Sequence, residues 1–110
     1  MFKNEIKKQK YKYEKEKKTN THKTIIHAGE EVYFNEPLIV IGNVNKDANL
    51  YIKSNIVFIG DVKGNIYLLD DNSSIYADKF TNAIFIDSYG RKKVFTASKK
   101  IINHDEMEAL

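Results

Sequence analysis

The sequence predicts an all-β fold, namely a triangular β-helix of about three coils in which every coil holds three short strands. Between Leu38 and Leu68 nearly every even-numbered residue is apolar or small, while the odd-numbered positions are rich in Asn, Asp and Lys. This alternation with a period of two is typical of strands that bury one face, and it excludes a helix. The phrase "LIVIGNV" also returns eighteen residues later as "IVFIGDV". A constant repeat of that length indicates stacked coils.

A repeat of eighteen residues gives each side of a coil about six residues and places residue i over residue i+18. The aliphatic residues that recur at every sixth position then form a column inside the helix. Gly42 and Gly60 fall at equivalent corners, where a permissive backbone or close packing is needed. The expected stacked pairs are Leu38 with Ile56, Val44 with Val62 and Leu50 with Leu68.

A third coil is visible but less regular, because the corner "DDNSS" contains one extra residue. An incomplete first coil, "TIIHAGEEVYFNE", precedes the regular set, and we expect Ile26 and either Val32 or Phe34 to face inward. An antiparallel sandwich is the alternative fold, although it does not predict a constant repeat. The expected pairs of the third coil, at spacings of nineteen and then eighteen, are Ile56 with Ile75, Phe58 with Ala77, Ile66 with Ile84 and Leu68 with Ile86.

The distribution of charge divides the chain into parts that the net charge of +3 conceals. Residues 1–24 carry nine Lys and three Glu without an apolar face, so we expect a Lys-rich tail that is disordered or helical. Residues 25–104 should form the β-helix domain, and residues 105–110 a C-terminal tail. Because residues 25–90 carry four Lys and nine acidic residues, we expect no specific nucleic acid as a partner.

The residue types typical of active sites are scattered in this chain. His22, His27 and His104 lie far apart in the sequence, and no cysteine is present, so we expect no metal and no cofactor. Asp70-Asp71 is interpreted as a solvated turn, and Ser73-Ser74 has no base within sequence reach. We therefore predict that the protein is not an enzyme. The chain also has no apolar run as long as a membrane span, and we expect a cytoplasmic protein.

One outward row of the expected β-helix is apolar. An aliphatic stripe on the outside of a β-helix must be covered. Either residues 91–110 fold back across it or a second subunit covers it, and we predict a homodimer. The row consists of Ile39 and Ile41, stacked over Val57 and Ile59, with Tyr76 expected above Val57.

Laid out in coils, residues 25–102 resemble the C-terminal domain of the bacterial septum-site-determining protein MinC. That family reads approximately as a glycine-led strand, then Leu-Ile-Val-x-Gly-x-Val-Asn-x-x-Ala, then Asn-Ile-x-Val-x-Gly-x-x-x-Gly, and then Ile-x-Ala before an apolar strand. The corresponding blocks here are Gly29–Phe34, Leu38–Ala48, Asn55–Gly64, Ile75–Ala77 and Ala83–Ile86.

The resemblance implies a right-handed β-helix that homodimerises through one apolar face and serves as a binding module in division-site selection. In the family this domain docks on the membrane-associated ATPase MinD, and the complex keeps the division protein FtsZ from assembling a ring at the wrong place. The membrane is then reached only indirectly, at its inner face, through the partner. The partner-binding residues that the resemblance implies are His27, Gly29 and Glu30, with Asp47 and Asp61 nearby. The family's Arg-Ser-Gly-Gln motif reads His27-Ala28-Gly29-Glu30 here.

Two other kinds of β-helix remain as alternatives. Bactofilins are polymerising cytoskeletal β-helices with a short helical core between disordered tails, and their coils associate end to end. Hexapeptide acyltransferases share the period of six and use a catalytic His near a loop, but this chain has no His between residues 28 and 103.

Overall fold

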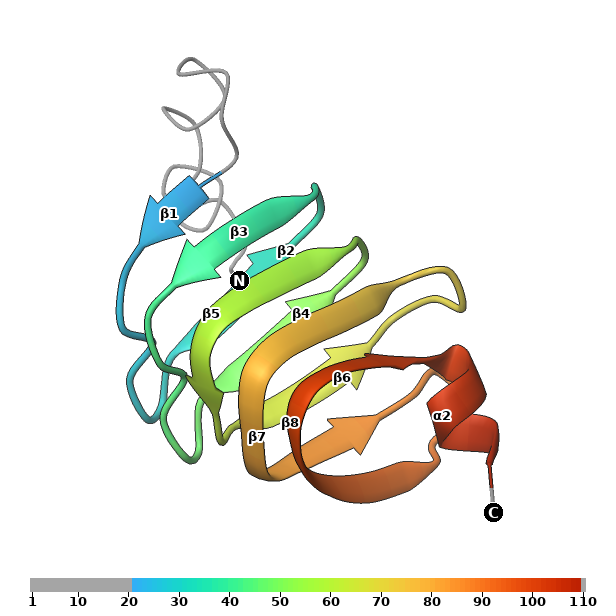
Figure 1. The fold of residues 1–110 in the computed structure, drawn as a ribbon. Coiled ribbons are helices and arrows are strands. Elements are labelled where there is room, and N and C mark those ends of the chain that lie inside the picture. Colours follow the sequence, from blue (N-terminus) through green and yellow to red (C-terminus); the bar gives the residue numbers. More distant parts are fainter. Residues whose placement is uncertain (1–20, 110) are drawn as a thin grey trace.

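The computed structural model describes residues 21–109, which form a β-solenoid of about four turns (Figure 1). The predicted β-helix is therefore confirmed. The Lys-rich tail predicted for residues 1–24 lies outside the described residues except at its end, where a strand begins at Thr21. The elements are β1 (Thr21–Lys23), β2 (Glu31–Phe34), β3 (Leu38–Ile41), β4 (Asn49–Ile52), β5 (Ile56–Val62), β6 (Asn65–Leu68), β7 (Ser74–Ile86), β8 (Lys92–Asn103) and α2 (His104–Glu108).

The solenoid has three sides. The β3 side consists of β1, β3, the first half of β5 and the first half of β7, all paired in parallel. The β4 side consists of β2, β4, β6 and the last part of β7, also in parallel. A short side between them is made by bridges from Ile26 to Val44 and from Val44 to Val62, and Val62 pairs with Phe80. Figure 1 shows these coils stacked along one axis.

The stacked pairs expected for the first two full coils are partly confirmed. Leu38 pairs with Ile56 and Val44 pairs with Val62 at the predicted spacing of eighteen. The expected pair of Leu50 with Leu68 is wrong, because Leu50 pairs with Ile66 and the spacing between β4 and β6 is sixteen. The corner before β6 is two residues shorter than the corner before β4. It is also tight, since a Cβ at Gly64 would lie 2.7 Å from the Ala48 carbonyl oxygen.

The third coil shows one register shift that confirms the prediction and one further shift that was not predicted from the sequence. Ile56 pairs with Ile75 and Phe58 with Ala77, which confirms the extra residue in the "DDNSS" corner. The expected pairing of Ile84 and Ile86 with Ile66 and Leu68 is wrong, because Phe85 pairs with Ile66. A register shift between Phe80 and Ala83 moves the strand by one residue, so Phe85 is buried and Ile84 faces outward.

The last strand reverses the direction of the chain. A turn at Asp87–Arg91 leads into β8, which pairs with β7 in the antiparallel sense along the whole of the last coil. The helix α2 follows at once, capped by the Asn103 side chain, which accepts hydrogen bonds from the backbone N–H groups of Asp105 and Glu106. Met107 is only 1 % exposed, so the packed domain extends past the expected boundary at residue 104. This end of the solenoid is therefore closed by a reversed strand and a short helix.

The core fills the interior of the coils along their whole length. Ile26, Val32 and Phe34 are buried, so the expected first coil is present and both Val32 and Phe34 face inward. The interior phenylalanines pack edge to face, with ring centroids 6.0 Å apart for Phe34 and Phe58. A rigid interior of this kind holds the outward side chains in fixed rows.

Candidate interaction surface

The outward side chains of the β3 side form the apolar row predicted from the sequence, and we call them the apolar face. Because residues that pair in parallel point to the same side of a sheet, the registers of β3, β5 and β7 stack these side chains directly. Ile39 and Ile59 are 40 % and 42 % exposed, while Ile41, Val57 and Tyr76 are half-buried. The apolar face consists of Ile39, Ile41, Val57, Ile59, Tyr76 and Ile101.

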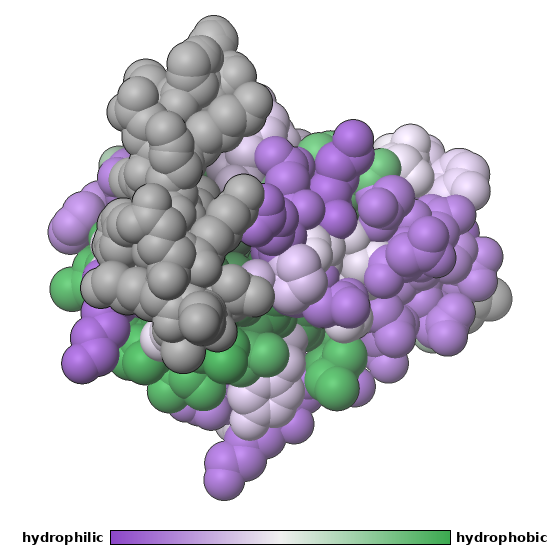
Figure 2. All heavy atoms as spheres, turned by 90° about the horizontal axis from the view of Figure 1, so that it is seen from above, coloured by the Kyte–Doolittle hydropathy of each residue, from purple (hydrophilic) through white to green (hydrophobic). Residues whose placement is uncertain are grey.

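The C-terminal segment does not cover this face. The alternative that residues 91–110 fold back across it is wrong for the residues that the structure describes, because β8 extends the sheet edgewise. The new strand adds Ile101 beside Tyr76, and Ile101 is itself 55 % exposed. Figure 2 shows hydrophobic surface gathered on one flank of the molecule and bordered by hydrophilic side chains.

Charged side chains border the apolar face. Lys23 pairs with Ile41 and continues its column at one end, in β1. At the other end Asp78 stands opposite Ile59 and Gly60, where β5 contains a bulge relative to β7. The Tyr76 hydroxyl donates to the Asp78 carboxylate at 3.4 Å. Partial burial, and next the charge of Asp78, raise the pKa of Tyr76, so this hydroxyl stays protonated at neutral pH.

The residues expected to bind a MinD-like partner are partly brought together. His27, Gly29 and Glu30 form one turn, in which the His27 N–H donates to the Glu30 side chain at 2.7 Å. The Gly29 N–H donates to the Asp47 carbonyl at 3.0 Å, so Asp47 lies next to this turn. Asp61 is at the other end of the short side, where its carboxylate accepts a hydrogen bond from the Thr81 hydroxyl at 2.9 Å.

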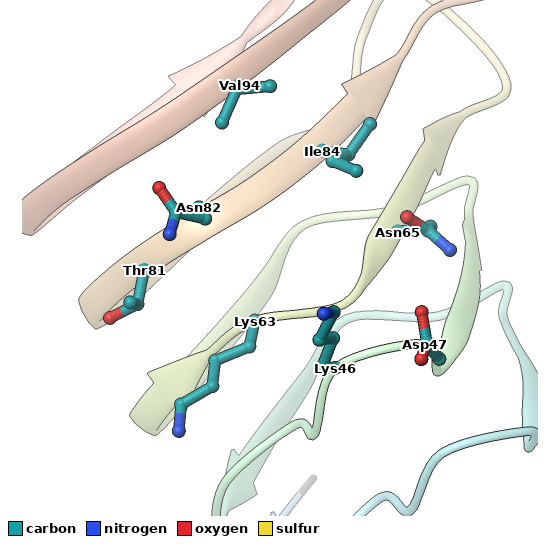
Figure 3. A pocket seen from close by; sticks show the side chains of 8 residues that line it. All are labelled: Lys46, Asp47, Lys63, Asn65, Thr81, Asn82, Ile84 and Val94. Carbon is teal, nitrogen blue, oxygen red and sulfur yellow. The ribbon is translucent and has the colours of Figure 1, made fainter.

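A shallow pocket of about 380 Å³ adjoins the Asp47 corner. Its polar side chains come from the corners that precede β4 and β6, from the start of β6 and from the middle of β7. Ile84 and Val94 close it on the side of β7 and β8 (Figure 3). Lys46 and Lys63 are exposed. The pocket therefore combines polar side chains at its rim with the apolar side chains of Ile84 and Val94. Its lining residues are Lys46, Asp47, Lys63, Asn65, Thr81, Asn82, Ile84 and Val94.

The other polar clusters stabilise turns. The Asp70 carboxylate accepts hydrogen bonds from the Asn72 and Ser73 N–H groups and from the Ser73 hydroxyl, at 3.2, 3.1 and 2.6 Å, which is a turn of the expected kind. His104 lies 3.4 Å from Asp71 and 3.3 Å from Glu108 and so links α2 to this turn. Within residues 21–109, no three His, Asp or Glu side chains are placed so that they could hold a metal ion.

A tyrosine ladder on the outside of the β4 side was not predicted from the sequence. The rings of Tyr33, Tyr51 and Tyr67 stack with centroid distances of 4.5 and 4.9 Å. Beside them the Asn65 side chain donates to the Asn49 side-chain oxygen at 2.9 Å. Partial burial, followed by the charge of Glu31, raises the pKa of Tyr51. The signal that could have revealed this ladder is the repeat of "NLY" as "NIY" after sixteen residues.

Comparisons with known proteins identify no relative of this chain. Neither the models of known protein families, nor the curated proteins, nor the solved structures gave a match. In the described part of the chain, no helix has the length and apolar character needed to cross a membrane.

Proposed function

We propose that this protein is a non-enzymatic interaction module that forms a homodimer through the apolar face. The observation that carries the proposal is the continuity of outward aliphatic side chains over β3 and β5, extended by Tyr76 and Ile101. A contiguous apolar patch with a charged border is the common form of a protein interaction site. A two-fold axis suits such a row, because the same flat surface meets itself.

The expected association is weak. Full burial of an isoleucine is worth about 1.5–3 kcal/mol. Because Ile39 and Ile59 are only 40 % and 42 % exposed in one chain, each gains less than half of that on dimerisation. Lost rotational and translational freedom opposes the remaining gain. We therefore expect a dissociation constant of about 1–100 μM.

Sedimentation velocity over a range of protein concentrations tests the dimer. The wild type should shift from monomer to dimer, whereas Ile59→Lys should stay monomeric with an unchanged melting temperature. Val94→Lys is the matched control, because Val94 is 60 % exposed but lies on the β4 side. A wild type that remains monomeric at several hundred micromolar, a concentration above the expected dissociation constant, would overturn the proposal.

The finer role that we propose is regulation of division-site selection through a MinD-like ATPase, with FtsZ ring assembly as the process that is opposed. It is supported by the likeness in sequence to the MinC C-terminal domain and by the placement of His27, Gly29, Glu30 and Asp47 at one corner. This corner lies between the short side and the β4 side, so it leaves the apolar face free for a second copy. The protein would act in the cytoplasm and reach the inner face of the membrane through this partner.

End-to-end polymerisation, as in bactofilins, fits the fold less well. The last strand, β8, is antiparallel to β7 and carries Lys92, Lys93, Lys99 and Lys100. Lysines on an edge strand oppose pairing with another edge. The helix α2 packs beside the same strand, with the Lys93 ammonium donating to the Glu106 carbonyl at 2.9 Å.

A further inference from the structure

The apolar face is built from two parallel columns, and in one of them a lysine and an aspartate flank a pair of isoleucines. The first column runs Thr21, Ile39, Val57, Tyr76 and Ile101 across the sheet. The second column runs Lys23, Ile41 and Ile59, meets Asp78 at the bulge of β5 and ends at Lys99, which stands opposite Asp78 in β8. Neighbouring members of a column are about 4.8 Å apart. Lys23 and Asp78 therefore sit symmetrically about the midpoint between Ile41 and Ile59, with one strand between each charge and that midpoint.

This symmetry has a consequence for two copies that meet face to face. If the two-fold axis runs along the strands, midway between β3 and β5, the solenoids are antiparallel and each column faces its own copy in reverse order. Ile41 then lies over the second copy's Ile59, and Ile39 over its Val57. In the same arrangement Lys23 lies opposite the second copy's Asp78, and this ion pair occurs twice. Thr21 also faces Tyr76, whose hydroxyl is protonated at neutral pH.

Other ways of joining the two faces lose this complementarity. If the two-fold axis lies on β5, Ile41 faces the second copy's Asp78. Lys23 then faces the second copy's Lys99, because Lys99 stands opposite Asp78 in β8. If the axis lies midway between β5 and β7, Ile59 faces the second copy's Asp78 and Ile41 faces its Lys99. A parallel arrangement, with the axis along the solenoid, sets Thr21 against Lys23 and Tyr76 against Asp78. A buried charge without a partner and a pair of like charges both weaken an interface.

We propose that two copies of this chain dimerise with antiparallel solenoids, and that reciprocal Lys23–Asp78 pairs fix this orientation and register. The inference rests on the proposed homodimer and adds which residues meet. The aliphatic side chains of the apolar face attract one another in many registers. The two charge pairs favour only one of these registers.

Charge reversal in mixed samples tests the orientation. Lys23→Asp alone and Asp78→Lys alone should each weaken self-association by about tenfold, since each homodimer then contains two pairs of like charge. Mixing the two variants should restore association to within about threefold of the wild type, because both pairs of the heterodimer are again opposite in charge. Lys53→Asp is the control, because Lys53 is exposed and follows β4 on another side of the solenoid. Its self-association should not change.

Cysteine cross-linking gives a second readout on folded protein, and the absence of native cysteines keeps the background clean. Under mild oxidation, a mixture of Ile41→Cys and Ile59→Cys chains should form a covalent heterodimer. Each variant alone should cross-link at least tenfold more slowly, because its two cysteines are about 4.8 Å further apart along the column.

The outcomes separate the two proposals. A wild type without self-association overturns both the homodimer and its orientation. A wild type that dimerises, with no rescue on mixing and no preference for the 41–59 cross-link, overturns the antiparallel register and leaves the homodimer standing.

Discussion

An alanine Cβ at position 60 would lie 2.2 Å from the carbonyl oxygen of Gly42, one coil away. Real Cβ atoms do not approach backbone oxygen so closely, so Gly60→Ala must push two coils apart at this corner. We expect a loss of about 2–4 kcal/mol in the free energy of unfolding, measured by urea denaturation. Gly90→Ala is the comparison, because a Cβ there meets no atom within 4 Å and only its φ of +84° is strained. It should cost about 1 kcal/mol, and equal losses for the two variants would contradict this account.

The short side of the solenoid depends on Val62, which is fully buried between Val44 and Phe80. Val62→Asp would place a carboxylate in the core without a partner, which should cost more than about 4 kcal/mol and unfold the domain. Circular dichroism at 25 °C and a thermal melt provide the measurement. Lys63→Asp, at the exposed neighbouring position, should leave the melt within a few degrees of the wild type. A cooperative, unshifted melt for Val62→Asp would mean that the interior is assigned incorrectly.

The turn that precedes β8 is held by Asp87. Burial alone would raise the pKa of this carboxyl, but hydrogen bonds from the Arg91 N–H, the Arg91 guanidinium and the Tyr89 N–H together lower it below its ordinary value. A lowered pKa in the folded state stabilises the protein above the unfolded pKa of about 4, and this stabilisation is lost as the pH falls through the folded pKa.

Asp87→Asn should therefore reduce stability at pH 7 by about 1–3 kcal/mol, because the charged acceptor of three hydrogen bonds is lost. Between about pH 4 and pH 2 the variant should lose less stability than the wild type does. Denaturation curves at a series of pH values measure both effects. Parallel pH profiles for the two proteins would show that Asp87 does not contribute to acid sensitivity.

The proposed contact with a MinD-like ATPase can be tested with two variants of Glu30, of which only one preserves the hydrogen bond of its turn. Glu30→Gln keeps a side-chain oxygen that can accept from the His27 N–H, whereas Glu30→Lys removes the acceptor and reverses the charge. If the charge matters for docking, both variants should weaken co-sedimentation with the ATPase, ATP and lipid vesicles, by about threefold for Gln and more for Lys. Asp61→Asn is the comparison, because Asp61 lies at the other end of the short side. Undiminished co-sedimentation of both Glu30 variants would place the contact elsewhere.

Burial could be predicted from the sequence where the number of residues between paired strands changes by an even number, but not where it changes by an odd number. The corner before β6 is shorter by two residues, and an even change keeps every side chain on the same face. Burial on the β4 side was therefore predicted correctly although Leu50 was assigned to the wrong neighbour. The shift near Asn82 is a single residue, which exchanges the inward and outward sets, so Phe85 and not Ile84 enters the core.

The end of the chain could not be predicted in the same way. In β8 the inward residues Phe95 and Ala97 are only half-buried, and lysines occupy both faces, so the alternation that marks other strands is faint. The parallel repeat also gave no sign of a reversal, which depends on the hydrogen bonds of Asp87 within its turn. The apolar face was predicted up to Tyr76, and its extension to Ile101 follows from the reversed strand alone.

The reversal of the chain after Gly90 also decides where such a protein can lengthen. A coil duplicated after Asn103 would need to pair in parallel with a strand that runs the other way, so tandem growth at this end is blocked. A coil inserted at the corner of residues 53–55 would instead meet parallel neighbours on both sides. Coils can therefore be added within the solenoid, but not as further parallel coils after β8.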